Sequence, residues 1–159
     1  MLLIRAAQPE DVGTILKLIR GLAEYEREPL AAEATEQGLL RDGFGASPRF
    51  YCLIAEWENS PVGFALYFYN YSTWKGRPGI YLEDLFVWPE HRGKGIGKAL
   101  LLHVARIAVA ENCGRYEWQV LDWNTPAIEF YEGLGARRMK QWLPMRVEGE
   151  ALLELAGKK

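Results

Sequence analysis

The sequence has little of what several protein classes require. Its 159 residues include two cysteines and two histidines, and 19 basic side chains stand against 21 acidic ones. Cys52 and Cys113 lack the spacing and the histidine partners of a metal site, so we expect two unpaired thiols in a reducing compartment and no bound metal. These features argue against a disulfide scaffold and against a zinc module.

The small net charge of −2 argues against nucleic-acid binding, which usually requires a clear basic excess. The amino-terminal apolar stretch is too short for a signal peptide, and the longer apolar segments are interrupted by Asn70 or by His103 and Arg106. We therefore expect no membrane association, a cytoplasmic location and a small-molecule partner.

What is present is the composition of an ordinary globular domain, 49% hydrophobic and 25% charged. We find no internal repeat and no linker, so residues 1–159 are expected to form one α+β domain. Apolar periodicity and turn residues predict strands at 2–6, 50–56, 62–71, 80–87, 116–121 and 137–143, with a short further stretch at 145–147. They predict helices from Pro9 through Leu22, at 35–42 closed by Gly43 and Gly45, at 98–112, at 125–134 and, weakly, at 150–155.

The turn between the strand at 80–87 and the long helix is the most informative segment. It combines glycines with cations, in the order Arg92, Gly93, Lys94, Gly95, Gly97 and Lys98. Glycines at a helix start expose backbone N–H groups at the positive end of the helix dipole, so the turn predicts a cradle for an anion. Arg92 and Lys98 occupy glycine positions of the nucleotide triphosphatase loop and of the dinucleotide fingerprint, which disfavours both.

Other polar side chains allow two interpretations each. The charged run at 24–29 is either a solvated helix end or a rim that attracts a cationic ligand. Glu83 is either a salt-bridged strand residue or a proton acceptor, and Tyr131 is either a core tyrosine or a proton donor. Trp74 belongs to an aromatic cluster that either packs the core or a dimer interface, or lines an acceptor site.

These motifs resemble those of the GCN5-related N-acetyltransferase (GNAT) superfamily. Its pyrophosphate loop, R/Q-x-x-G-x-G/A, is matched by residues 92–97. Further matching segments stand at the right intervals around it, at 42–45, 71–77, 81–84, 122–124 and 130–136. The combination is similar to the diamine and thialysine N-acetyltransferase branch over most of the chain.

The resemblance implies a mixed, mostly antiparallel twisted sheet flanked by helices. Its fourth and fifth strands, at 80–87 and 116–121, would splay apart around the arm of acetyl-CoA. The implied cofactor contacts are Leu85, Phe86, Val87, Arg92, Gly93, Lys94, Gly95, Ile96, Gly97, Lys98, Asn124 and Tyr131. A homodimer is implied as well.

The chemistry of amine acetylation requires particular groups. An aliphatic amine with a pKa near 10.4 is only about a thousandth neutral at physiological pH, so a base must take its proton. Glu83 fits this role, and we expect Asp84 to face the opposite side of the strand because strand side chains alternate. The resemblance makes Tyr131 the general acid that protonates the leaving thiolate. The expected acceptor contacts are Tyr25, Glu26, Trp74 and Glu83.

We therefore predict an acetyl-CoA-dependent N-acetyltransferase that acts on a primary amine of a small acceptor by direct attack. The alternatives are a protein lysine or N-terminal acetyltransferase and a non-catalytic acyl-CoA-binding module. The sequence departs from the polyamine pattern, with Ser72 in place of an aspartate and with Lys140 and Gln141 in place of acidic residues. Fewer carboxylates favour thialysine or a monoamine over a polyamine.

Overall fold

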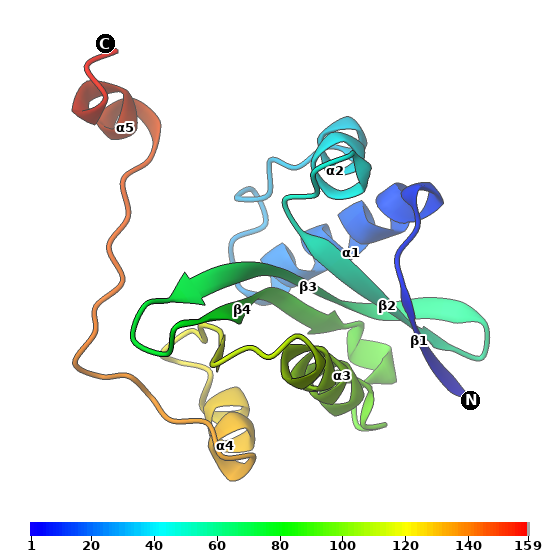
Figure 1. The fold of residues 1–159 in the computed structure, drawn as a ribbon. Coiled ribbons are helices and arrows are strands. Elements are labelled where there is room, and N and C mark those ends of the chain that lie inside the picture. The colour runs from blue at the N-terminus through cyan, green and yellow to red at the C-terminus, as the bar shows by residue number, and fades with distance from the viewer. Residues whose placement is uncertain (159) are drawn as a thin grey trace. The chain divides into compact units, whose positions relative to one another are not determined.

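The computed structural model describes residues 1–158 and divides into two compact units. The first unit, Met1–Gln119, contains a five-stranded sheet and three α-helices. The second unit begins at Val120 and contains two short helices joined by a long segment without regular structure (Figure 1). Each unit is described by itself below.

The sheet follows the order of the chain, β1-β2-β3-β4-β5. The strands are β1 (Leu2–Ala6), β2 (Tyr51–Trp57), β3 (Ser60–Ser72), β4 (Arg77–Val87) and β5 (Tyr116–Glu117). Neighbouring strands are antiparallel except for the last pair, β4 and β5, which is parallel. Positive φ angles at Glu58 and Asn59 form the two-residue turn between β2 and β3, as this kind of tight hairpin requires.

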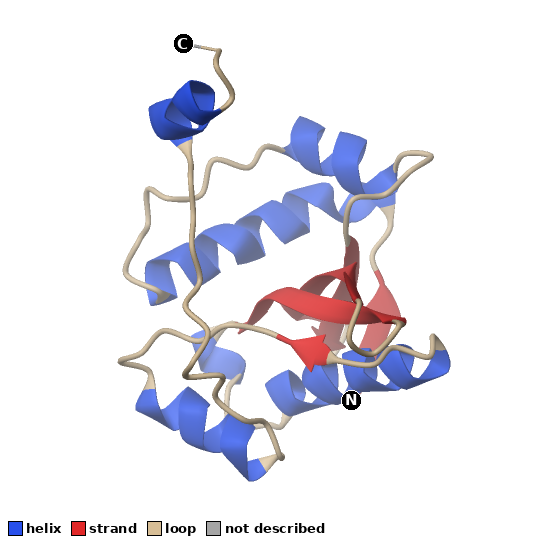
Figure 2. Cartoon of the chain, turned by 60° about the vertical axis from the view of Figure 1, so that its left-hand side comes forward, coloured by secondary structure: helices blue, strands red, loops and turns tan. Residues whose placement is uncertain are grey.

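Helices of the first unit cover both faces of the sheet (Figure 2). A short turn of helix, η1 (Pro9–Asp11), leads into α1 (Val12–Tyr25), and α2 (Glu36–Phe44) packs against α1. A second short turn, η2 (Pro89–His91), precedes α3 (Ile96–Ala110), which covers the other face. In the second unit the helices are α4 (Thr125–Gly133) and α5 (Gly149–Leu155).

Alternating side chains of the strands form a core on each face. On one face α1 and α2 bury Ile15, Leu18 and Leu39 together with strand residues that include Phe64, Leu66 and Phe86. On the other face α3 buries Leu100, Leu101, Val104 and Ala108, the stripe that its periodicity predicted. These two apolar layers fix α1 and α3 on opposite sides of β4.

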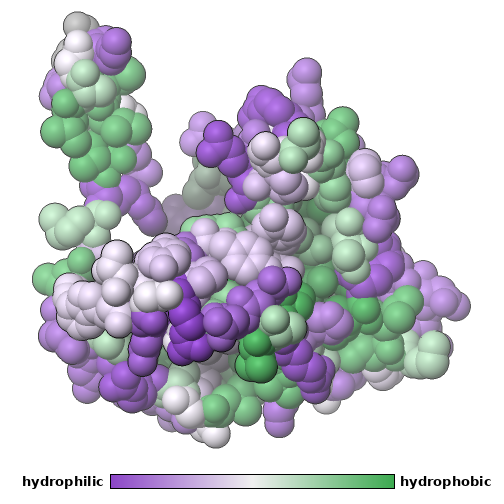
Figure 3. All heavy atoms as spheres, viewed as in Figure 1, coloured by the Kyte–Doolittle hydropathy of each residue, from purple (hydrophilic) through white to green (hydrophobic). Residues whose placement is uncertain are grey.

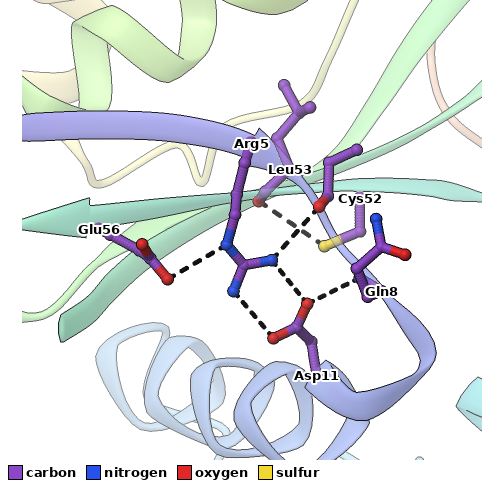
Figure 4. A network of polar contacts seen from close by, with 7 residues as sticks. Arg5, Gln8, Asp11, Cys52, Leu53 and Glu56 are labelled. Atoms are coloured by element: carbon purple, nitrogen blue, oxygen red, sulfur yellow. Dashed lines mark hydrogen bonds and ion pairs between the residues drawn. The ribbon is translucent and has the colours of Figure 1, made fainter. Parts of the chain in front are cut away.

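Arg5 of β1 connects three parts of the first unit (Figure 4). Its guanidinium donates to both carboxylate oxygens of Asp11, at 2.8 and 3.0 Å, and its Nε donates to Glu56 Oε2 at 3.1 Å. Asp11 also accepts from the backbone N–H of Gln8 at the entrance to the helix. Two-pronged pairing of this kind is geometrically specific, so Arg5 ties the start of α1 to the edge of the sheet.

Most expected elements are confirmed, and three predictions are wrong. Gly43 does not end α2, because it lies inside the helix, where an added Cβ would stand 2.3 Å from the ring of Phe50. The fifth strand ends at Glu117 instead of residue 121. Residues 137–143 and 145–147 form no strand, because no strand partner lies beside them within residues 120–158. Arg138 instead pairs with Glu132 of α4, from Nε to Oε2 at 2.9 Å.

Candidate active site

The outer edge of β4 is open along its second half. β4 pairs with β5 only at Ile80 and Tyr81, so within residues 1–158 the stretch 82–87 has no strand partner on that side. The backbone N–H of Trp88 donates to Val62 on β3, and backbone directions alternate along a strand. The backbone groups of Leu85 and Val87 therefore point toward the open edge. The structure thus has an open edge of β4 where the resemblance implied a splayed strand pair, and β5 itself ends at Glu117.

A bulge interrupts β4 at Glu83. Leu66 of β3 pairs with Asp84, whereas the next residue, Tyr67, pairs with Leu82, so Glu83 is the extra residue of the register shift. Paired residues share a face of the sheet, and Leu66 packs in the α1 core. Asp84 therefore lies on the α1 face, while Leu82 lies on the α3 face. The alternation of side chains is shifted by one residue at Glu83.

Three carboxyl groups gather on the α1 side of this bulge. Glu26 immediately follows α1, and burial together with the charge of Glu83 raises the pKa of Glu26. Burial, followed by repulsion from Glu83 and Glu26, raises the pKa of Asp84 to about 7. A cluster of like charges that mutually repel favours the binding of a cation. We call Glu26, Glu83 and Asp84 the carboxylate cluster.

The expectation that Asp84 faces away from Glu83 is wrong. Regular alternation would separate neighbouring strand residues, but the bulge breaks that alternation and brings Asp84 to the cluster side. The sequence holds a signal that could have revealed the bulge, since two adjacent acidic residues stand between Leu82 and Leu85. A half-buried antiparallel strand would place one polar residue between apolar ones.

The glycine turn leads from the end of β4 into α3. Gly93 and Gly95 both have a φ of +78°, and Gly95 is the residue before the helix. An added Cβ would meet nothing within 4 Å at either position, so the backbone conformation is what requires glycine. The first hydrogen bond within α3 runs from the N–H of Ala99 to Gly95 O. The N–H groups of residues 96–98 precede it and suit an anion.

Arg92 turns back from this loop onto β4 and α1. Its Nε donates to the carbonyl of Val87 at 3.0 Å. Its guanidinium carbon lies 4.4 Å from the ring centroid of Tyr25 and 5.5 Å from that of Phe86. Lys94, in contrast, lies 5.0 Å from the ring centroid of Trp57. The two loop cations therefore have different surroundings.

Trp74 stands apart from the carboxylate cluster within the first unit. It lies in the turn between β3 and β4 with 80% of its surface exposed. The seven residues of β4 from Arg77 to Glu83 span about 20 Å. Ser72, the last residue of β3, is buried beside this turn, and its Oγ accepts from the N–H of Lys75 at 3.0 Å. The Ser72 hydroxyl therefore stabilises the turn through a hydrogen bond, and it carries no negative charge as an aspartate at this position would.

Asn124 and Tyr131 belong to the second unit. Asn124 is the residue before α4, and its carbonyl accepts from the N–H of Ile128 at 3.1 Å. Tyr131 is in the last turn of α4, where its ring lies 5.5 Å from that of Phe130. Both side chains are partly buried within the chain. Their roles in catalysis and cofactor binding remain predictions.

Comparison with known proteins places this arrangement among the acetyltransferases. The model of the acetyltransferase (GNAT) family matches residues 15–136. A thialysine N-epsilon-acetyltransferase of Sus scrofa is 46% identical over 98% of this chain and 98% of its own length. An L-ornithine N5-acetyltransferase of Arabidopsis thaliana is 34% identical over 94% of this chain and 85% of its own length.

A solved structure shares the fold of this chain. An integron cassette protein from the mobile metagenome of V. cholerae superposes with a TM-score of 0.83 and 30% identity, covering 98% of this chain and 97% of its own. The predicted fold, the diamine and thialysine branch and the class of N-acetyltransferase are thereby confirmed. With a family model that spans most of its length and relatives of this similarity, the chain belongs to the acetyltransferase (GNAT) family.

Proposed function

We propose that the protein transfers the acetyl group of acetyl-CoA to the side-chain amine of a short amino acid such as thialysine, or to a similar small amine. The observation that carries this proposal is the carboxylate cluster beside the open edge of β4. The relatives named for thialysine and for L-ornithine add support, because both of these acceptors are amino acids with a side-chain amine.

Acetyl-CoA, the donor that GNAT acetyltransferases generally use, fits the chain at two places. Its pyrophosphate would lie against the backbone N–H groups of the glycine loop, with Lys94 and Lys98 supplying positive charge. Its extended arm would continue the sheet along the outward-facing backbone of Leu85 and Val87. The side chain of Phe86 packs in the α1 core, and by the same alternation its backbone groups face β3, so we assign Phe86 no hydrogen bond to the arm.

The carboxylate cluster would capture the acceptor as an ammonium and remove its proton. Only the neutral amine attacks a thioester, and supplying it from a group of pKa near 10.4 at physiological pH costs about 4 kcal/mol. We assign Glu83 as the base, acting directly or through one water. Asp84 lies next to it with a pKa near neutrality, which suits proton exchange at the pH of the cell.

Attack by the amine nitrogen would form the new C–N bond and place negative charge on the carbonyl oxygen. A backbone N–H near the end of the Glu83 strand would stabilise that charge. Collapse then breaks the C–S bond, and the leaving thiolate takes the phenolic proton of Tyr131. The conjugate acid of such a thiolate has a pKa near 8.5, so this transfer is useful at neutral pH. Asn124 is assigned to the cofactor arm.

The exposed apolar side chains of the second unit support a homodimer. Trp142, Leu143 and Met145 expose 59%, 79% and 91% of their surfaces, and α5 presents further leucines (Figure 3). Exposed apolar side chains gathered in this way can mark a contact with another chain. We propose that a second copy covers them. Light scattering on the purified protein tests the dimer, which a monomeric mass at micromolar concentration would exclude.

We also propose a single catalytic domain and a cytoplasmic location. One catalytic domain over residues 1–159 is supported by the family match, which crosses the boundary between the units. A cytoplasmic location is supported by Cys52 and Cys113, which are both free thiols. Among residues 1–158, no helix has the length and apolar character needed to cross a membrane.

The experiment that tests the proposed function measures thiol release from acetyl-CoA against a panel of amines. The panel contains thialysine, a simple monoamine, spermidine, a lysine-containing peptide and a peptide with a free amino terminus, and mass spectrometry locates the acetyl group on each product. We expect turnover with the small amines. Preference for either peptide would support a protein acetyltransferase, and tight acetyl-CoA binding without any turnover would support a binding module.

A further inference from the structure

Arg92 makes two contacts that a phosphate ligand would not need. Its Nε donates to the carbonyl of Val87, the last residue of β4, at 3.0 Å. Its guanidinium carbon lies 4.4 Å from the ring centroid of Tyr25, which is within the range of a cation–π contact. Arg92 thus joins the end of β4 to the last residue of α1, from a position next to the first glycine of the cofactor loop.

The Tyr25 contact bears directly on the carboxylate cluster. Glu26 follows Tyr25 at the point where α1 ends, and the next residue, Arg27, has a φ of +65° that turns the chain away. Glu26 and Glu83 repel each other, and so do Glu26 and Asp84. Mutual repulsion opposes the apolar packing that holds α1 against β4, so a contact across the two elements at the end of α1 would help to keep Glu26 in place.

We infer that Arg92 is a positioning residue for the amine site: it fastens the end of α1 to β4 and so holds Glu26 in the carboxylate cluster. This inference rests on the proposed function for the identity of the acceptor. The cofactor loop depends less on the Arg92 side chain, because its backbone N–H groups and the start of α3 would hold the pyrophosphate. Removing the guanidinium should therefore weaken amine binding far more than acetyl-CoA binding.

A lysine at position 92 separates the two roles of arginine. It keeps the positive charge, but its single flexible ammonium cannot stack flat on the Tyr25 ring and also donate to the Val87 carbonyl. If Arg92 served phosphate through its charge, Arg92→Lys would restore most of the acetyl-CoA affinity lost in Arg92→Gln. If it positions Glu26, Arg92→Lys and Arg92→Gln should impair amine binding alike.

The test measures two affinities by calorimetry: CoA for the free protein, and thialysine for the protein saturated with CoA. For Arg92→Lys we expect the thialysine Kd to rise about tenfold and the CoA Kd to stay within about threefold. Tyr25→Leu should raise the thialysine Kd similarly, and adding Arg92→Lys to it should change little more, because both substitutions break one contact. Lys94→Gln is the contrasting variant, expected to weaken CoA more than thialysine.

Turnover supplies the second readout. With saturating acetyl-CoA, Arg92→Lys should raise the KM for thialysine while kcat stays within about twofold. An unchanged thialysine Kd in Arg92→Lys, or a large loss of CoA affinity in Arg92→Gln that lysine restores, would overturn the inference. Wild-type protein that binds thialysine without acetylating it would refute the proposed function, while the Kd comparison would still decide the role of Arg92.

Discussion

Glu83 and Asp84 are neighbours in β4 whose acidic groups act together because Glu83 is the extra residue of a bulge. In a regular strand the two side chains would lie on opposite faces. Here the shifted register carries Asp84 to the α1 face, where burial and the charges of Glu83 and Glu26 raise its pKa to about 7. Bulges commonly re-aim side chains beside active sites, and this one assembles the carboxylate cluster.

The raised pKa of Asp84 predicts how stability depends on pH. An unfolded aspartate has a pKa near 3.9, so between about pH 4 and pH 7 the folded protein holds a proton that the unfolded chain has released. The free energy of unfolding should therefore decrease as the pH rises through this window, by up to about 4 kcal/mol. Asp84→Asn should abolish that part of the decrease, as measured by urea unfolding at several pH values.

The control for this change is Asp42→Asn. Asp42 pairs with Arg41 at the surface, and this pairing lowers the pKa of Asp42. Its stabilising effect is lost only as the pH falls below the usual range of an aspartate, so its removal should leave the slope between pH 4 and pH 7 unchanged. Identical slopes in wild type and Asp84→Asn would mean that Asp84 is not shifted.

Glu83→Gln tests the assignment of the base. Without this carboxylate, removal of the amine proton depends more on the solvent, so the pH of half-maximal activity should move upward toward the pKa of the amine. Weaker capture of the ammonium should appear as a higher KM. Rates measured from pH 6 to pH 10 check both effects, with Glu111→Gln at the exposed end of α3 as the matched control. A superimposable pH profile would count against Glu83.

Gly95→Asp tests the cofactor loop. The substitution places a negative charge at the start of α3, where the proposed pyrophosphate would lie, so acetyl-CoA affinity should fall by at least ~2 kcal/mol, or roughly 30-fold. Gly157→Asp is the matched control, because Gly157 also has a positive φ, +72°, with open space around its Cα. Calorimetry on both folded variants measures the difference. Equal affinities in the two would remove the phosphate site from the loop.

Tyr131→Phe tests the proposed acid. If the phenol protonates the leaving thiolate, its hydroxyl acts only in the transition state, so kcat should fall on the order of 100-fold with little change in acetyl-CoA binding. Steady-state kinetics and a binding titration on the same preparation separate these quantities. Near-normal turnover would require a different proton donor.

Local patterns were sufficient to predict most of the fold, because apolar spacing and turn residues are properties of neighbouring positions. Helical periodicity alone predicts that Leu100 and Val104 lie on the buried side of α3. The strand expected at 137–143 failed because a strand needs a paired neighbour, which local sequence does not report. The bulky side chains of residues 137–143 fit the pattern of a strand, but in the described part of the chain no neighbouring strand forms hydrogen bonds with this segment.

The sequence predicts those parts of the candidate site that belong to recognisable motifs. Residues 92–97 predict the glycine loop, and the chemistry of amine acetylation predicts Glu83 as the base, a role that stays a prediction. Asp84 was misplaced because strand alternation was assumed to be unbroken. The stacking of Arg92 on Tyr25 joins residues 67 positions apart, and no local pattern encodes such a contact.

The most direct test of the proposed function compares kcat/KM for thialysine and for spermidine at saturating acetyl-CoA. The carboxylate cluster offers a compact site for one ammonium, and Ser72, Lys140 and Gln141 supply no further negative charge along the chain. A polyamine needs carboxylates spread along its length, so we predict a higher kcat/KM for thialysine. A clear preference for spermidine, or no transfer to either amine, would contradict this account.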